Sequence, residues 1–222
     1  MLLAIDTSTA QVGLALYKKD RVVGELLWNS YQHHTVEMAP ALAQLLARVD
    51  LKINAIRAIG VALGPGSFTS LRVGLSLAKG LALARNLPII GVPTLNIVAK
   101  AQAVCDKPLA AVLQAGRKRI AVGMYKAHQE NWQSQGAAQV TTVDEFAGKI
   151  KKPTIVCGEL SADERQRLSR KRKNVLLVSP AQCVRRPAFL AEMAWERWQA
   201  GEKDQIDTLA PIYLHVGEPL PG

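Results

Sequence analysis

Hydrophobic residues in the first thirty positions fall into three short runs, separated by polar turns. The runs cover residues 2–5, 12–17 and 22–28, and the turns lie at Asp6–Thr9 and Lys18–Asp20. Runs of this length, rich in residues that suit a pleated sheet and bounded by turn formers, predict strands. We therefore expect three strands joined as a meander of two hairpins.

The spacing of the apolar residues changes to three and four after residue 35, which is the helical period. Helices are predicted over about 35–49, 69–85 and 95–104, with short buried strands over 58–63 and 87–92. Strands that alternate with helices are typical of an α/β fold.

The pattern begins again after Pro108. We predict strands over 109–114 and 120–125, a polar loop over 128–136, a strand near 140, a helix near 144–150, strands over 154–157 and 175–178 with a basic helix between them, and a last helix over about 187–199. The expected organisation is two lobes, an N-terminal one of residues 1–104 and a smaller C-terminal one of residues 105–222.

Composition fits an ordinary globular protein, with 49% hydrophobic and 21% charged residues. No run approaches the roughly 18 apolar residues of a membrane span. Met1 leads directly into a strand-like segment without a basic stretch, so we expect a cytoplasmic protein. Three cysteines without a CxxC pair (Cys105, Cys157 and Cys183) indicate buried thiols rather than disulfides or a zinc site.

The net charge of +10 is shared by both halves of the chain and is densest in one segment near residue 170. Such a cluster can meet nucleic-acid phosphates by releasing counterions, although a solvated helix end is the usual alternative. No aromatic residues are interleaved for base stacking. The candidate RNA contacts are Arg165, Arg167, Arg170, Lys171, Arg172 and Lys173.

Two polar turns could bind an anion. Asp6, Thr7, Ser8 and Thr9 end the first strand, where oxygen ligands could face phosphate or magnesium. Gly64–Thr69 leads into a helix whose first N–H groups are unpaired, although it lacks the lysine of a P-loop. For Asp6–Thr9, composition alone favours a turn whose Ser and Thr side chains bond to the local backbone. For Gly64–Thr69, a turn that only sets the angle between strand and helix is equally compatible.

The two long predicted helices each carry a row of small residues at four-residue spacing, which permits close backbone approach. The helices could pack on each other or, together, on a second chain. The candidate contacts are Ala39, Ala43 and Ala47 on the first helix and Ser70, Leu71, Gly74, Ala78 and Ala82 on the second.

Catalytic and metal signatures are missing from the sequence. His33 and His34 are followed four residues later by Glu37 and Met38, so no HxxxH pair exists. No GxSxG motif marks a nucleophile. We expect neither a metal nor a cofactor.

Several segments together resemble one family. Leu3–Thr9, His34-Thr35, Gly91–Leu95, Pro211–Leu214 and above all the run GPGSFTSLRVG at 64–74 are similar to the bacterial TsaB (YeaZ) family. The resemblance is strong over residues 1–100 and weaker beyond them.

This resemblance implies the two-lobe fold of the actin, hexokinase and Hsp70 superfamily (ASKHA, ribonuclease-H-like). It also implies a noncatalytic partner of the TsaD-type transferase in threonylcarbamoyladenosine modification of tRNA, with a TsaE-type ATPase as third component. The first two helices would contact the transferase, or a second copy when the protein is alone, and tRNA would be met through the complex.

Departures from related patterns qualify these expectations. ATP-binding members of the superfamily have DxGT at the first turn, whereas this chain has Ser8 in place of glycine. We therefore predict that Asp6–Thr9 is a vestigial nucleotide site. The family's Asp-Ala-Arg hairpin has Gln114 in place of the acid.

Two enzymatic alternatives remain open at this point. An ATP-dependent phosphotransferase or ATPase of the same superfamily would use Asp6 to hold magnesium. A metallopeptidase-like protein would need the histidine pair that is missing here.

Overall fold

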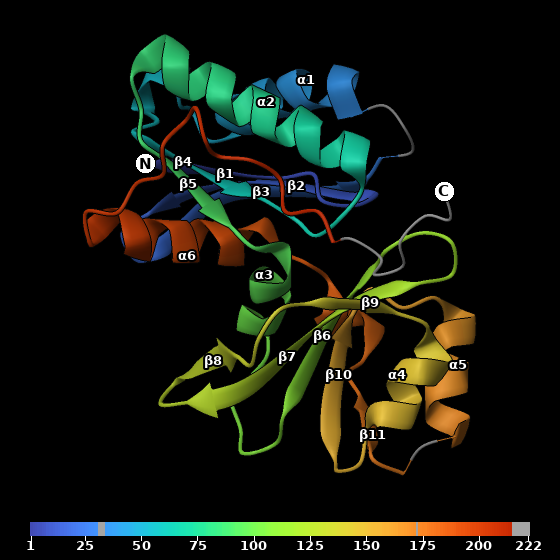
Figure 1. The fold of residues 1–222 in the computed structure, drawn as a ribbon. Helices are drawn as coiled ribbons and strands as arrows, with labels where there is room; N and C mark the ends of the chain where they lie inside the picture. Colours follow the sequence, from blue (N-terminus) through green and yellow to red (C-terminus); the bar gives the residue numbers. More distant parts are fainter. Residues whose placement is uncertain (31–33, 172, 215–222) are drawn as a thin grey trace. The chain divides into compact units, whose positions relative to one another are not determined.

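The computed structural model describes residues 1–30, 34–171 and 173–214 (Figure 1). Two compact units make up the chain. Unit 1 comprises Met1–Ile97 and Arg185–Ile212, and unit 2 comprises Val98–Val184 with Tyr213 and Leu214. Among the described helices, none has the length and apolar character needed to cross a membrane.

The boundary between the units differs from the predicted division at residues 104 and 105. Residues 185–212 belong to unit 1, although they follow unit 2 in sequence. The reason is the helix α6 (Pro187–Gln199), whose buried residues Leu190, Ala191 and Ala194 pack against the sheet of unit 1. A linear division could not anticipate this return of the chain.

The sheet of unit 1 has five strands in the order β3-β2-β1-β4-β5. Their bounds are β1 Leu2–Asp6, β2 Gln11–Lys18, β3 Arg21–Asn29, β4 Ala58–Ala62 and β5 Ile89–Val92. The predicted meander is confirmed, because β1 pairs antiparallel with β2, and β2 with β3. The central β1 also pairs in parallel with β4, which places its carboxyl end beside that of β4.

Helices cover both faces of this sheet (Figure 1). On one face lie α1 (His34–Arg48) and α2 (Phe68–Arg85), and on the other lies α6. Side chains of β1 alternate between the faces, so that Leu3 and Ile5 join the core under α1 and α2, while Leu2 and Ala4 join the core under α6. The short η1 (Ile53–Ala55) precedes β4, and α3 (Thr94–Lys100) follows β5.

The sheet of unit 2 has the strand order β11-β10-β6-β7-β8, with β9 paired to β7. The bounds are β6 Leu109–Gln114, β7 Ile120–His128, β8 Asn131–Ser134, β9 Gln139–Thr141, β10 Thr154–Gly158 and β11 Val175–Leu177. The prediction of a loop over 128–136 is wrong, because β8 pairs with the end of β7 over residues 131–134. This edge strand is almost entirely exposed and needs no apolar face, so hydrophobicity could not reveal it.

Two short helices, α4 (Val143–Lys149) and α5 (Ala162–Lys171), pack on unit 2, and η2 (Pro180–Cys183) follows β11. Phe146 of α4 and Leu168 of α5 are buried with Ile120 and Val122 of β7 in one hydrophobic cluster. This core sits on a single face of the sheet.

Candidate functional site

The Asp6 carboxylate lies at the carboxyl end of β1 and is buried. Its Oδ2 accepts a hydrogen bond from Nε of Arg185 at 2.6 Å, and both side chains are only 1% exposed. Its Oδ1 accepts the backbone N–H of Ser8 at 2.9 Å. A buried carboxylate needs such compensation, because an isolated charge in the interior is very costly.

Arg185 also donates hydrogen bonds to Thr9 and Gln11 of unit 1. Nη2 donates to Oγ1 of Thr9 at 3.0 Å and to the carbonyl oxygen of Gln11 at 2.7 Å. The backbone N–H of Arg185 donates to Oε1 of Gln11 at 2.8 Å. Sequence reasoning missed this residue, since it lies 179 positions from Asp6 and no local pattern marks an arginine as buried.

Thr7 faces helix α2. Its Oγ1 donates to the carbonyl oxygen of Ser70 at 2.6 Å. Gly74 lies so close that a Cβ there would come within 2.2 Å of Oγ1 of Thr7. The glycine inside α2 is therefore explained by the approach of the first turn.

Ser8 faces the loops that precede α2 and α3. Its Oγ shares a hydrogen bond with Oγ1 of Thr94 at 2.7 Å, and its carbonyl oxygen accepts the N–H of Ser67 at 2.7 Å. A Cβ on Gly66 would come within 2.1 Å of that carbonyl oxygen. The Asp6–Thr9 turn is thus buried and bonded to other parts of unit 1.

The Gly64–Thr69 turn is organised by hydroxyl groups. Oγ1 of Thr94 accepts the N–H of Gly64 at 2.9 Å, and the N–H of Thr94 donates to the carbonyl oxygen of Gly64 at 2.8 Å. Gly64 has φ +102°, a conformation that favours glycine. Ser67 caps α2, its Oγ accepting the N–H of Ser70.

The predicted row of small residues on α2 faces inward. Ser70, Leu71, Gly74, Ala78 and Ala82 are all buried in unit 1. Ala78 and Ala82 are part of its core under α1 and α2. These five residues pack against their own sheet and first turn, so their side chains do not form an open surface. That the row lies in or directly beneath a partner interface stays a prediction.

The small residues of α1, in contrast, lie at the surface. Ala39, Ala43 and Ala47 are exposed. Between α1 and α2 runs a groove of about 400 Å³ that is lined by Ala39, Phe68, Arg72 and Leu77, among others. The ring of Phe68 is 53% exposed, and the Arg72 guanidinium lies 3.6 Å from its centroid.

Two of the predicted RNA contacts on α5 have partners within unit 2. Arg167 pairs with Asp144 and, at 3.6 Å, with Asp163, and these carboxylates raise the pKa of Arg167. Arg165 donates to the carbonyl oxygen of Val178.

The remaining members of the basic cluster divide into two groups. Arg170 and Lys173 are exposed and stay candidates for RNA contact. The side chain of Lys171 and the whole of Arg172 lie outside the described residues.

Gln114 ends β6 and contacts the start of α5. Its Nε2 donates to Oε2 of Glu164 at 2.6 Å and to the carbonyl oxygen of Glu159 at 3.2 Å. The same Oε2 accepts the N–H of Ser161 at 2.7 Å. An acid at position 114 would set two carboxylates against each other, so the amide suits this site.

The cysteines and histidines form no reactive cluster in the described ranges. No group of three or more His, Cys, Asp or Glu that could hold a metal occurs there. All three cysteines are free, but only Cys157 is buried, so the prediction of buried thiols is wrong for Cys105 and Cys183. Burial raises the pKa of Cys157, which keeps this thiol protonated.

Comparison with known proteins gives a consistent result. A model of the TsaD family, described as tRNA N6-adenosine threonylcarbamoyltransferase, matches residues 28–180. The tRNA threonylcarbamoyladenosine biosynthesis protein TsaB of Bacillus subtilis is 28% identical over 98% of this chain and 95% of its own length. TsaB of Haemophilus influenzae is 40% identical over 47% of this chain and 43% of its own.

A solved structure extends the likeness to the fold. YeaZ from Pseudomonas aeruginosa superposes with a TM-score of 0.79 at 23% identity, over 96% of this chain and 99% of its own. The expected two-lobe ASKHA fold is confirmed. The chain therefore belongs to the TsaB (YeaZ) family of tRNA threonylcarbamoyladenosine biosynthesis proteins.

Proposed function

We propose that this protein is a noncatalytic scaffold that activates a TsaD-type transferase in the threonylcarbamoyladenosine modification of tRNA. The observation that carries the noncatalytic part is the buried ion pair of Asp6 and Arg185. In an ATPase of this superfamily the acid at this turn would hold magnesium. Here a guanidinium already neutralises it.

The surroundings of Asp6 support the same proposal. Both of its oxygens accept hydrogen bonds, and Ser8 is fully buried where a glycine would let phosphate approach the backbone. Magnesium would have to displace Arg185 and leave a buried cation unpaired. This cost weighs against the alternative function as an ATP-dependent phosphotransferase or ATPase, and we propose no cofactor.

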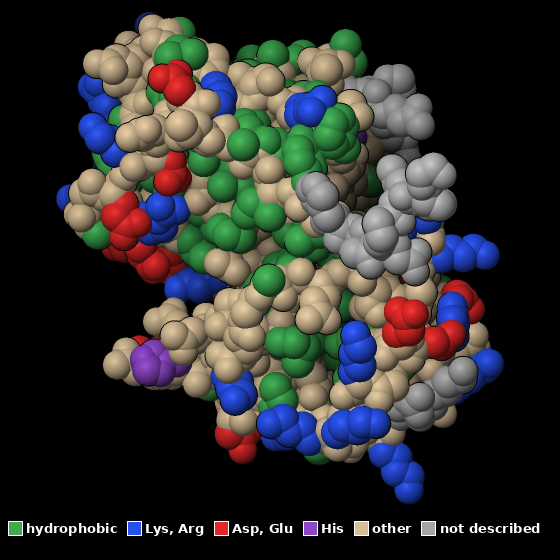
Figure 2. Space-filling view, viewed as in Figure 1, with side chains coloured by type: hydrophobic (Ala, Val, Ile, Leu, Met, Phe, Trp, Pro, Cys, Tyr) green, Lys and Arg blue, Asp and Glu red, His purple; other side chains and the backbone are tan. Residues whose placement is uncertain are grey.

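The groove between α1 and α2 is the partner surface that we propose. It exposes Phe68 beside Ala39, whereas most large apolar side chains of unit 1 are buried. Figure 2 shows hydrophobic side chains at the surface of this unit. Exposed apolar surface of this kind marks interaction sites. The groove would receive the transferase in the complex and a second copy when the protein is alone.

The remaining partners follow from family membership. We propose that a TsaE-type ATPase joins the complex, that tRNA is contacted through the assembled complex, and that the assembly works in the cytoplasm. The charge of +10 suits an electrostatic contribution to tRNA binding.

The proposal that the chain is a noncatalytic scaffold is tested by titrating the isolated chain with Mg-ATP and by measuring its ATPase rate. We expect neither tight binding nor hydrolysis, but a marked rise in threonylcarbamoyladenosine formation when the chain is added to the transferase, the ATPase and tRNA. Micromolar ATP affinity that is abolished by Asp6→Asn would favour the enzymatic alternative. Modification at the full rate without this chain would refute the scaffold.

The partner surface is tested with the double variant Ala39→Arg/Ser76→Arg, which fills and charges the groove. Because both side chains are exposed, the monomer should keep its melting temperature. We expect loss of self-association and at least tenfold weaker binding to the transferase, since desolvating two unpaired charges opposes docking. Ala127→Arg on the exposed end of β7 is the control for an arginine added outside the groove. Equal binding by both variants would place the interface elsewhere.

The tRNA contact is tested by reversing Arg170 and Lys173 to Glu. If these residues meet phosphates, tRNA binding by the complex weakens and its dependence on salt becomes shallower. The double variant Lys52→Glu/Lys203→Glu carries the same change of charge on exposed positions of unit 1. Equal loss in both variants would mean that only the net charge matters.

A further inference from the structure

Unit 2 contains a cavity of about 540 Å³, within the range of roughly 300–1,000 Å³ that small-molecule sites occupy. Its apolar lining includes Val122, Met124, Phe146 and Ile150. The proposed function uses none of these residues. The cavity lies at the sheet face that α4 and the loop between β8 and β9 border.

The cavity exists because α4 is too short to cover the sheet. Along β7, Ile120, Val122, Met124 and Lys126 point to the same face, since side chains alternate. Ile120 and Val122 are buried with α4 in the core, whereas Met124 is 37% exposed. The apolar face of β7 therefore continues beyond α4, where none of the described helices covers it, and forms the floor of the cavity.

The loop between β8 and β9 forms a second wall. The N–H of Gln135 donates to the carbonyl oxygen of Met124 at 2.8 Å, which fixes the loop beside the floor. Gly136 follows with φ +127°, a conformation that side-chain-bearing residues rarely adopt. This wall is set by backbone contacts.

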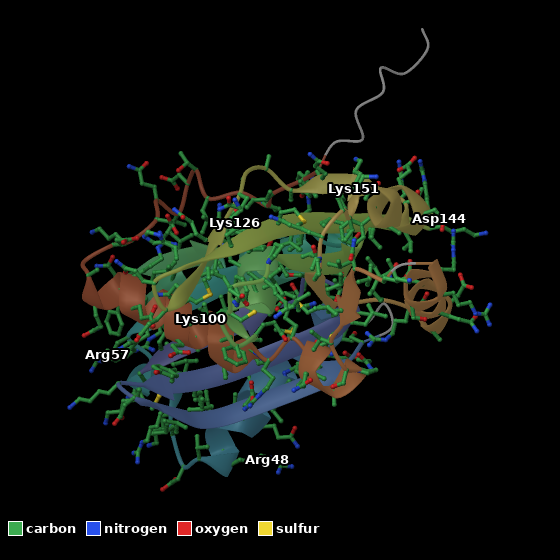
Figure 3. The ribbon with its side chains drawn as sticks, turned by 90° about the horizontal axis from the view of Figure 1, so that it is seen from below. Arg48, Arg57, Lys100, Lys126, Asp144 and Lys151 are labelled. Atoms are coloured by element: carbon green, nitrogen blue, oxygen red, sulfur yellow. The ribbon has the colours of Figure 1, made fainter. Side chains whose placement is uncertain are left out.

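Four lysines lie around the cavity, and no acid is part of its lining within the described chain. They are Lys126 from β7, Lys149 from the end of α4, and Lys151 and Lys152 before β10. Lys126 and Lys151 are labelled in Figure 3. Glu145 lies one helical turn before Lys149 and interacts with its charge. In Figure 2 the visible face of unit 2 shows hydrophobic side chains among lysines and arginines.

From these observations we propose that the cavity binds a small organic anion with an apolar or planar body and a phosphate or carboxylate head. The body packs on Met124 and Ile150, and the head meets Lys126 and Lys151. Charge complementarity selects the anion. A cavity with an apolar floor and a few convergent polar groups is the usual form of a ligand site.

The experiment titrates the full chain with phenyl phosphate and with hexanoate, followed by ligand-observed NMR and calorimetry. Inorganic phosphate supplies the head alone, and benzyl alcohol supplies the body alone. We expect phenyl phosphate or hexanoate to bind more tightly than either fragment. Which of the two binds better distinguishes a phosphate ligand from a carboxylate ligand.

The double variant Lys126→Gln/Lys151→Gln should bind about tenfold more weakly. The control Lys52→Gln/Lys203→Gln removes the same charge from exposed sites of unit 1 and should bind normally. Met124→Gln should weaken binding through the floor. All these side chains are exposed, so equal melting temperatures are expected. No binding at millimolar ligand, equal weakening in both double variants, or inorganic phosphate binding as well as phenyl phosphate would overturn the proposal.

Discussion

The two units repeat one topology with different amounts of helix. Strands β3-β2-β1-β4-β5 of unit 1 correspond in order and direction to β8-β7-β6-β10-β11 of unit 2. The helices α1 and α2 have 15 and 18 residues, whereas α4 and α5 have 7 and 10. The long pair covers its sheet and leaves a groove between helices, while the short pair leaves a cavity over the sheet itself.

The polar side chains at the corresponding strand ends also have different partners. β1 ends at a buried carboxylate that needs a cation from a distant part of the chain. β6 ends at the amide of Gln114, which donates to a carboxylate of the following helix region. The comparison shows that one topology can stabilise the polar side chain at the same strand end either with an ion pair or with a hydrogen bond between uncharged and charged groups. Mutations at the two strand ends should therefore change the free energy of unfolding by different amounts.

The largest expected effect comes from breaking the buried ion pair of unit 1. Arg185→Met leaves Asp6 buried without its cation, and we expect a loss of about 3–5 kcal/mol in the free energy of unfolding, measured by urea denaturation. Asp6→Asn combined with Arg185→Met should recover much of this loss. Arg186→Met breaks the pair with Glu25, in which the Arg186 side chain is 54% exposed, and should cost only about 1 kcal/mol because solvent screens this guanidinium. Similar losses for Arg185→Met and Arg186→Met would show that burial does not raise the cost of breaking the pair.

The next effect concerns the close approach of α2 in unit 1. Gly74→Ala places a methyl group against Thr7 and should cost about 2–3 kcal/mol through overpacking. Gly80→Ala, on the same helix with no atom within 4 Å of its added Cβ, should stabilise by up to about 1 kcal/mol. Thermal unfolding of both variants measures the difference. The same sign for the two changes would contradict the inward packing of this row.

A smaller effect is expected at the strand end of unit 2. Gln114→Glu sets a carboxylate against Glu164 and should cost about 1–2 kcal/mol at neutral pH. Like charges raise the pKa of one carboxyl, so the loss shrinks as the pH falls and that group gains a proton. Denaturation at pH 7 and pH 5 measures this. A loss that does not depend on pH would mean that shape, rather than charge, matters at this position.

The smallest effect tests how the short helices of unit 2 are held. Thr142→Ala removes the cap of α4 and should cost about 1 kcal/mol. The hydrogen bond from the Thr142 N–H lowers the pKa of Glu145, so the contribution of Glu145 is present above its unfolded pKa and is lost as the pH falls through the folded pKa.

Ser67→Ala at the cap of α2 is the comparison for this variant. Its bond to the N–H of Ser70, at 3.4 Å, is close in length to the 3.3 Å bond from the N–H of Glu145 to Thr142. Because α2 has 18 residues and a buried face, packing holds it more firmly than α4, and the loss of its cap should cost less. Chemical denaturation of both variants measures the difference. An equal cost for the two caps would show that the length of the helix does not matter.

The sequence by itself determined the elements with strong local patterns. The meander, the helices at 34–48 and 68–85, and the alternation of an α/β fold follow from hydrophobic spacing, because that spacing records which face is buried. The GPGSFTSLR run led to the family before any fold was known. Local signals of this kind need no distant partner.

Only the tertiary structure decided what depends on contacts far apart in the chain. The pairing of Arg185 with Asp6, the return of α6 to unit 1, the pairing of β8 and the inward orientation of Gly74 all join segments that share no local pattern. Small residues at four-residue spacing predict close approach but not its partner. The physical reason is that spacing along a helix fixes a face, whereas the neighbour of that face is chosen by the packing of the whole unit.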